Sequence, residues 1–175
     1  MNRNNIILIG MPGAGKSTVG VVLAKKLGYA FIDSDLIIQS REGQLLHEII
    51  SERGVEAFWK TEEEANLSID ASRTVVATGG SVVYGSSAME HFGQIGTIVY
   101  LKLSCGEIAH RLGDLHERGV TLREGQGLDE LYAERLPLYE KYADITVDCD
   151  GLSIREIVEK IFDLVSGTRG TGQKK

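Results

Sequence analysis

The sequence has few residues of the kinds that mark secreted, metal-stapled or membrane proteins. Its two cysteines, Cys105 and Cys149, are far apart and match no metal-binding spacing, so we expect buried free thiols in a reducing compartment. No stretch approaches the roughly 18 consecutive apolar residues that span a bilayer. The short apolar run near the N-terminus is used by the first predicted strand and does not resemble a signal peptide. The sequence therefore predicts a cytoplasmic protein without membrane contact.

Basic residues are also in deficit. Lys and Arg total 19 against 25 Asp and Glu, giving a net charge of −6 and a pI near 5.3. Nucleic-acid-binding proteins usually show a basic face, so this balance argues against a nucleic-acid partner. An apolar content of 42% in 175 residues is typical of one globular domain. We predict a single domain over residues 1–165 and a polar, glycine-rich, disordered tail over residues 166–175.

The most informative stretch is residues 5–20. Four apolar residues, 6–9, have the character of a fully buried strand. The pattern G-x-x-x-x-G-K-S follows over residues 10–17, and residues 19–27 then show helical apolar spacing. This strand–loop–helix context is the one in which a phosphate-binding P-loop works, so we prefer it to a glycine-rich turn.

The residue types explain the expected chemistry. Glycines let successive backbone N–H groups point inward, and the following helix adds the positive end of its dipole. The side chain of Lys16 can reach the β- and γ-phosphates, and the hydroxyl of Ser17 can ligate Mg²⁺. The expected ligands are therefore ATP and Mg²⁺. The predicted nucleotide-binding residues in this loop are Gly13, Ala14, Gly15, Lys16, Ser17 and Thr18.

Two further polar stretches follow predicted strands. Asp33-Ser34-Asp35 comes after the strand at residues 29–32, and Gly79-Gly80-Ser81 comes after the strand at residues 74–78. On an extended chain the two carboxylates point to the same side, although one of them could serve only as a helix cap. Glycines at 79 and 80 allow close approach of backbone to a ligand, although a tight turn without a ligand has the same composition.

The remaining pattern alternates helices with strands. Further strands are predicted at residues 96–103 and 145–148, which gives a five-stranded parallel sheet between two helical layers. Residues 114–128 are charged and rich in glycine, and we interpret them as a mobile lid that carries Arg118 and Arg123. Residues 62–64, three glutamates, are interpreted as a solvated face.

At this point the chain resembles the shikimate kinases, small P-loop kinases related to the nucleoside monophosphate kinases. The resemblance covers most of residues 5–165. It is carried by residues 10–18, 31–35, 54–58 and 77–80, by Arg118, and by Arg135-Leu136-Pro137-Leu138-Tyr139. The fold it implies is a three-layer α/β/α P-loop kinase with a mobile lid. The activity it implies is transfer of a phosphoryl group from ATP to shikimate, giving shikimate 3-phosphate, by a protein expected to be a monomer.

The resemblance also implies roles for individual residues. Asp33 would hold the metal through water, together with Ser17. Asp35 would accept a hydrogen bond from a substrate hydroxyl group and would be its base. Backbone N–H groups of Gly79 and Gly80 would face the substrate. Three arginines have implied roles as cations. Arg135 would pair with the substrate carboxylate, Arg118 would stabilise the transferring phosphoryl group, and Arg111 would flank the adenine.

Three positions depart from the family pattern. The family has Phe-Arg where this chain has Phe58-Trp59, and that arginine is a second clamp on the shikimate carboxylate. Trp59 cannot supply charge, so it either packs in the core or stacks on a different acceptor. Ser81 replaces a third glycine, and Arg118-Gly119-Val120 replaces Arg-Pro-Leu. The acceptor could therefore be another small hydroxy acid or polyol, as in a gluconate-type kinase. A nucleotide-binding paralogue without kinase activity is the other alternative.

Overall fold

The computed structural model describes residues 3–112 and 120–170. A parallel sheet of five strands lies at its centre, in the spatial order β2-β3-β1-β4-β5. The strands are β1 (Asn5–Ile9), β2 (Ala30–Asp33), β3 (Thr74–Ala77), β4 (Gly96–Lys102) and β5 (Ile145–Asp148). The five strands predicted from the sequence are all confirmed, with boundaries that agree to within one residue.

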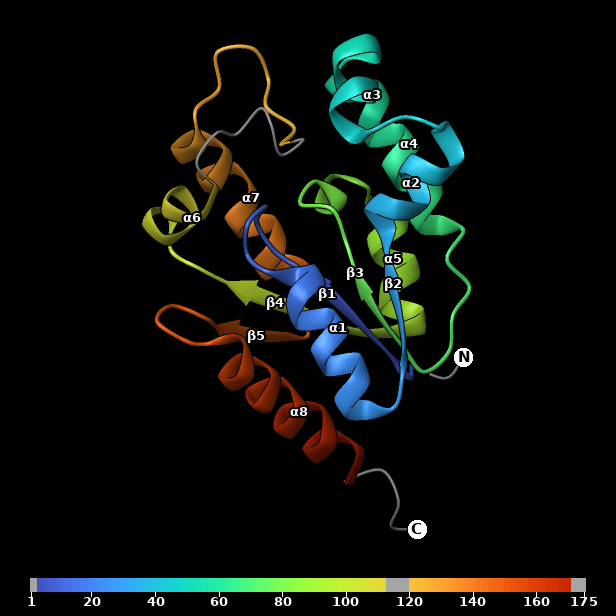
Figure 1. The fold of residues 1–175 in the computed structure, drawn as a ribbon, viewed down its shortest axis with the longest axis vertical. Helices are drawn as coiled ribbons and strands as arrows, with labels where there is room; N and C mark the ends of the chain where they lie inside the picture. Colours follow the sequence, from blue (N-terminus) through green and yellow to red (C-terminus); the bar gives the residue numbers. More distant parts are fainter. Residues whose placement is uncertain (1–2, 113–119, 171–175) are drawn as a thin grey trace.

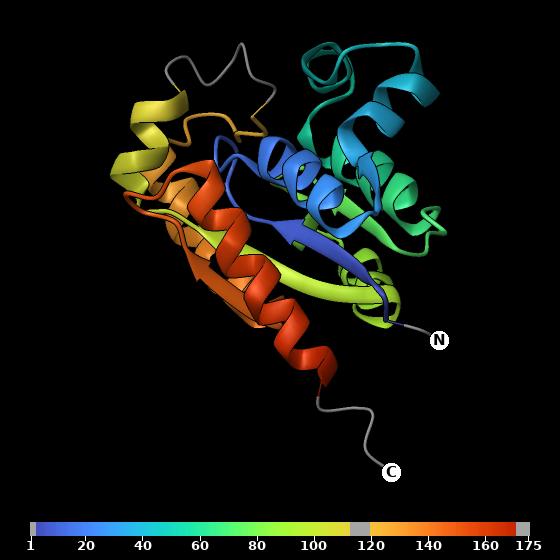
Figure 2. The ribbon, with the colours of Figure 1, turned by 60° about the horizontal axis from the view of Figure 1, so that its bottom comes forward.

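Helices cover both faces of the sheet, as Figures 1 and 2 show. Helices α1 and α8 pack against each other on one face, and α5 and α7 lie on the other. The helices are α1 (Lys16–Leu27), α2 (Ser34–Glu42), α3 (Leu46–Arg53), α4 (Val55–Leu67), α5 (Ser86–Ile95), α6 (Cys105–Leu112), α7 (Leu128–Tyr142) and α8 (Ile154–Gly170), with a 3-10 turn, η1, at Val82–Tyr84. This is the three-layer α/β/α architecture that the sequence predicts.

The main core lies between these layers. Every residue of β1 and β3 is buried, as expected of strands covered on both faces. A second, smaller core joins α2, α3 and α4 through four buried side chains: Ile38, Ile49, Phe58 and Ala65. These three helices form a separate lobe beside the carboxyl end of β2 (Figure 1).

Two local predictions need correction or completion. Helix α8 continues to Gly170, so residues 166–170, which we expected to be disordered, are helical; extending a formed helix costs little per residue. Helix α5 was not predicted. Of the proposed lid, residues 114–119 lie outside the described residues, and residues 120–127 lead into α7. Among the described helices, none combines the length and apolar character needed to cross a membrane.

Candidate active site

The P-loop joins β1 to α1, as predicted. Gly15 is the N-cap of α1, and Gly13 and Gly15 have φ angles of 80° and 87°, which favour glycine. The ammonium group of Lys16 donates to the carbonyl oxygens of Gly10 and Met11, at 2.8 and 2.9 Å. Burial lowers the pKa of Lys16 to about 8, although Asp35 nearby acts in the opposite direction. The loop thus contains a buried cation beside a glycine backbone.

Asp33 links the end of β2 to the P-loop. Its Oδ2 accepts a 2.6 Å hydrogen bond from Ser17 Oγ, and its Oδ1 accepts one from the backbone N–H of Asp35. Asp33 is therefore the N-cap of α2 as well as the neighbour of Ser17, so the capping alternative holds for one of the two carboxylates. Asp35 lies in the first turn of α2 rather than on an extended strand. A hydroxyl and a carboxylate side by side are oxygen ligands that suit Mg²⁺.

A cavity of about 460 Å³ opens beside the P-loop, at the carboxyl ends of β1, β2 and β3. Ligands of open α/β sheets bind at this edge. The predicted site residues that line the cavity are Gly13, Gly15, Lys16, Ser17, Thr18, Asp35, Gly79, Gly80 and Arg111. The cavity therefore brings together the three polar stretches that the sequence places after separate strands.

Glu62 lines the same cavity, and its prediction as a solvated residue is wrong. It is only 2% exposed and follows Phe58, also buried, by one helical turn of α4. Burial raises the pKa of Glu62 to about 7, with a hydrogen bond from Ser81 opposing the shift. Burial, reinforced by the neighbouring Asp33, raises the pKa of Asp35 to about 6. The pKa values of two carboxyl groups at the cavity are therefore raised toward neutral pH.

The two glycines after β3 leave room that any side chain would fill. An added Cβ at Gly79 would collide with Glu62 Oε1 and lie 2.9 Å from Asp35 Oδ1. An added Cβ at Gly80 would lie 2.7 Å from Pro12 Cδ and 3.1 Å from a nitrogen of Arg135. The carbonyl oxygen of Gly80 accepts a hydrogen bond from the Tyr139 hydroxyl, which fixes this turn against α7.

Arg135 lies behind Gly80 and is 0% exposed. Its Nη2 donates to the hydroxyl and carbonyl oxygens of Thr121, at 2.6 and 3.2 Å, and its Nε donates to the Tyr84 hydroxyl at 3.3 Å. Its Nη1 has no partner among the described residues. Asp35 Oδ1 and Glu62 Oε1 are likewise buried without a partner. Unpaired buried polar atoms around one cavity indicate a polar ligand.

Of the other predicted site residues, Ala14 and Arg111 lie in or beside the cavity, whereas Trp59 does not line it. Ala14 is buried within the P-loop, and Arg111 on α6 lines the cavity while it pairs with Glu107. Trp59 lies outside the cavity lining. Its ring is 4.4 Å from that of Tyr84, and it packs against the small core of α2, α3 and α4. Arg118 lies outside the described residues.

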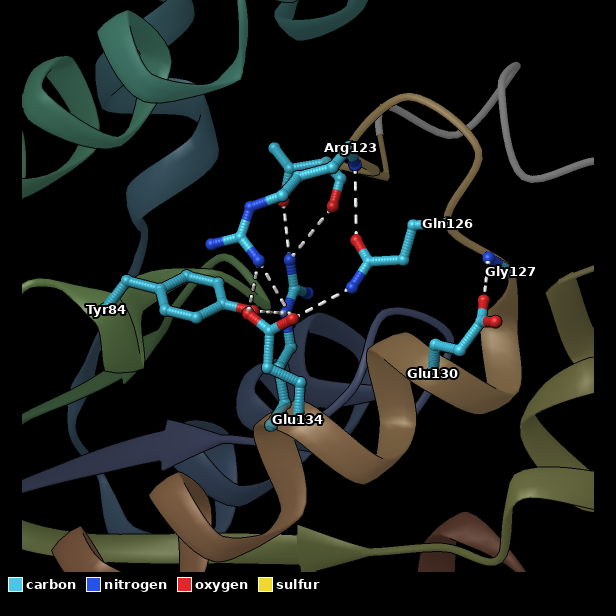
Figure 3. A network of polar contacts seen from close by, with 8 residues as sticks. Tyr84, Arg123, Gln126, Gly127, Glu130 and Glu134 are labelled. Atoms are coloured by element: carbon cyan, nitrogen blue, oxygen red, sulfur yellow. Dashed lines mark hydrogen bonds and ion pairs between the residues drawn. The ribbon is translucent and has the colours of Figure 1, made fainter.

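A polar network that we did not predict joins the segment at residues 120–127 to α7 (Figure 3). Arg123 Nη1 contacts both carboxylate oxygens of Glu134, at 3.0 and 3.2 Å. Glu134 also accepts from the Tyr84 hydroxyl at 2.6 Å and from Gln126 at 2.9 Å. The sequence analysis considered Arg123 as a cation of the lid, but it did not consider Tyr84, Gln126 or Glu134.

The site so assembled can do three things chemically. The P-loop can bind phosphate groups through backbone N–H groups and Lys16. Asp35 and Glu62 can accept hydrogen bonds from hydroxyl groups. Arg135 has a free buried nitrogen that can donate to an anion.

Comparison with known proteins agrees with a site that binds phosphate groups and a hydroxylated, anionic ligand. The family model described as shikimate kinase matches residues 12–166. A shikimate kinase of Thermodesulfovibrio yellowstonii is 40% identical over 160 residues, which is 90% of this chain and 92% of that protein. The structure of shikimate kinase from Acinetobacter baumannii in complex with shikimate superposes with a TM-score of 0.86 at 31% identity, covering 98% of this chain and 96% of that one.

A gluconokinase from Sinorhizobium meliloti also has this fold, with a TM-score of 0.58, 18% identity and coverage of 99% and 100% of the two chains. At that identity the likeness concerns the fold alone. The family model, in contrast, covers most of the chain, and the identities to shikimate kinases extend over nearly its whole length. This chain belongs to the shikimate kinase family, whose members are ATP-dependent kinases.

Proposed function

We propose that this protein transfers the γ-phosphoryl group of ATP to a hydroxyl group of shikimate, giving ADP and shikimate 3-phosphate. The observation that carries the proposal is the single cavity that both Lys16 of the P-loop and Asp35 line. Transfer of a phosphoryl group depends mainly on positioning and on stabilisation of charge, so a phosphate cradle must open directly onto the acceptor.

The nucleotide occupies the P-loop side of the cavity. Backbone N–H groups of the loop and the ammonium group of Lys16 hold its phosphates, and Arg111 flanks the adenine. Arg118 has the role of the cation that closes over the transferring phosphoryl group. The residues assigned to the nucleotide are Gly13, Ala14, Gly15, Lys16, Ser17, Thr18, Arg111 and Arg118.

Ser17 and Asp33 would hold Mg²⁺. The fit rests on their geometry, because a hydroxyl oxygen and a carboxylate oxygen lie 2.6 Å apart at the entrance to α1. A bound Mg²⁺ supplies positive charge that neutralises the phosphate oxygens as the phosphoryl group leaves ADP.

The acceptor occupies the side of Asp35, Gly79 and Gly80. The hydroxyl oxygen of the acceptor forms a bond to the γ-phosphorus while the bond from that phosphorus to the bridging oxygen of ADP breaks. Asp35 takes the hydroxyl proton, a role that its unpaired Oδ1 allows. Arg135 pairs with the acceptor carboxylate through its free Nη1.

Two alternatives keep the same nucleotide site. A kinase for gluconate or a similar polyol acid would use Asp35 and the P-loop equally well. A nucleotide-binding paralogue without turnover would need neither Asp35 nor Arg135, and both are present with unpaired buried atoms. The identity to shikimate kinases over nearly the whole chain favours shikimate. A cytoplasmic location and a monomeric state stay predictions from the sequence.

An assay of ADP release with Mg-ATP separates these possibilities. Shikimate, gluconate, quinate and no acceptor are compared at equal concentrations, with wild type beside Asp35→Asn. We expect ADP release that requires shikimate in wild type and is lost in the variant while ATP binding is retained. Faster release with gluconate, or release independent of any acceptor, contradicts the proposal.

A further inference from the structure

A guanidinium group lies over the ring of Trp59. The Cζ atom of Arg123 is 5.2 Å from the centroid of that ring, within the range of a cation–π contact. Position 59 is where the family resemblance calls for an arginine that this chain lacks. Helix α4 therefore has no positive charge at position 59, but Arg123, from the segment at residues 120–127, places one over the face of the Trp59 ring.

Arg123 is connected to Arg135 through shared atoms. Its Nη1 contacts Glu134 Oε1, which accepts from the Tyr84 hydroxyl, which in turn accepts from Arg135 Nε. The rings beneath the two guanidinium groups are themselves in contact, because Trp59 and Tyr84 lie 4.4 Å apart and Arg135 Cζ lies 5.2 Å from the Tyr84 ring. The two cations thus lie over adjacent aromatic rings. Figure 3 shows Arg123, Tyr84 and Glu134 in the polar network that connects them.

The pairing of Arg123 with Glu134 can be exchanged. Their side chains are 48% and 31% exposed, and ion pairs at this exposure contribute little stability. Glu134 keeps hydrogen bonds from Tyr84 and Gln126 if Arg123 moves away. Within residues 3–112 and 120–170, the side-chain hydrogen bonds of Arg123 all involve Nη1, which leaves the other edge of its planar group for a second acceptor.

We propose that Arg123 is a specificity-determining residue that, together with Arg135, binds the carboxylate of the acceptor, in place of the arginine absent from position 59. This inference rests on the proposed function. The Trp59 ring orients the guanidinium of Arg123, and the acceptor carboxylate replaces Glu134 as its partner. A cation carried on the segment before α7 thereby makes acidic acceptors preferred over neutral ones.

The test compares an acidic acceptor with its neutral counterpart. Shikimate and its methyl ester are assayed with wild type, Arg123→Ala, Arg123→Lys and the control Arg155→Ala, which removes an exposed arginine on α8. Loss of one charge-assisted contact predicts that the acid-to-ester ratio of kcat/KM falls about 10- to 100-fold in Arg123→Ala. The change should appear in KM for shikimate, with kcat nearly constant. Arg123→Lys should retain part of the preference, and Arg155→Ala all of it.

Two further measurements separate binding from a purely structural role. Trp59 is the only tryptophan of the chain, so its fluorescence reports the stack directly. Shikimate should change that fluorescence in wild type but not in Arg123→Ala, and the ester should have little effect. Adding Trp59→Arg to Arg123→Ala should restore the acid-to-ester ratio, because it returns a cation to α4.

The outcomes are distinct. This inference is overturned if Arg123→Ala lowers kcat/KM equally for the acid and the ester. It is also overturned if the ratio falls together with Tm and Trp59→Arg does not restore it. In either case, turnover of shikimate by wild type leaves the proposed function standing. Absence of shikimate turnover in wild type overturns the proposed function, and this inference with it.

Discussion

The carboxyl groups of Asp35 and Glu62 converge on the same side of Gly79. An added Cβ there would meet an oxygen of each, and both of those oxygens are buried without a hydrogen-bond partner among the described residues. The pKa values of both groups are raised by burial, to about 6 and about 7. Two unpaired acceptors at one point suit a ligand with more than one hydroxyl group, since hydroxyl groups supply the missing donors.

Gly79→Ala should strongly reduce activity without unfolding the protein. The new methyl group must displace Glu62 and Asp35, so we expect kcat/KM for the acceptor to fall by about 100-fold or more, as misplacement by about 1 Å can cost. Gly93→Ala is the matched control, because an added Cβ there meets nothing within 4 Å. Steady-state kinetics with thermal unfolding check the pair. Near-normal activity of Gly79→Ala would show that the two carboxylates do not define the acceptor site.

Glu62→Gln should stabilise the protein at neutral pH. Glu62 keeps its proton in the folded state up to about pH 7, whereas its ordinary pKa is 4.5, so the folded state binds more protons between these values. The contribution of Glu62 to the stability of wild type therefore decreases as pH rises from about 4.5 to about 7. The variant should be more stable by about 1–3 kcal/mol at pH 8 and nearly equal to wild type at pH 4.5. Unfolding by urea at both pH values measures this, and an equal difference at the two would contradict the burial argument.

Lys16→Met should separate nucleotide binding from stability. Burial lowers the pKa of Lys16 to about 8, so at pH 7 its buried charge costs desolvation free energy, which an apolar side chain avoids. We expect turnover to fall by about 1000-fold or more with little loss of Tm, because the phosphates lose their cation. ATP titration followed by calorimetry checks the loss of affinity. Unchanged ATP affinity would remove Lys16 from the nucleotide site.

Arg135→Lys should weaken acceptor binding and also lower the stability of the protein. Lysine keeps the charge but cannot reach Thr121, Tyr84 and a ligand together, because it lacks the planar fork of arginine. We expect KM for shikimate to rise about 10- to 100-fold, with a loss of stability of about 1–3 kcal/mol. Kinetics and urea unfolding measure the two effects separately. Unchanged KM for shikimate with the expected loss of stability would give Arg135 a structural role only.

The sequence predicted those parts of the site that depend on local pattern. The P-loop and the five strands follow from spacings within a few residues, whereas capping of α2 was only an alternative for one of Asp33 and Asp35. Glu62 was missed because three glutamates in a row resemble a solvated face. Its burial depends on which side of α4 meets Gly79, although the helical spacing from Phe58 was a usable signal. The contact of Arg123 with Trp59 joins positions 64 apart in sequence, and no local pattern encodes it.

The most direct test of the account identifies the product of wild type incubated with Mg-ATP and shikimate. Phosphorus NMR should show one molecule of shikimate 3-phosphate for each ADP formed, and Asp35→Asn should form neither at a comparable rate. Release of ADP without a phosphorylated shikimate, or no reaction with shikimate while another hydroxy acid is phosphorylated, would contradict the assignment of the acceptor site.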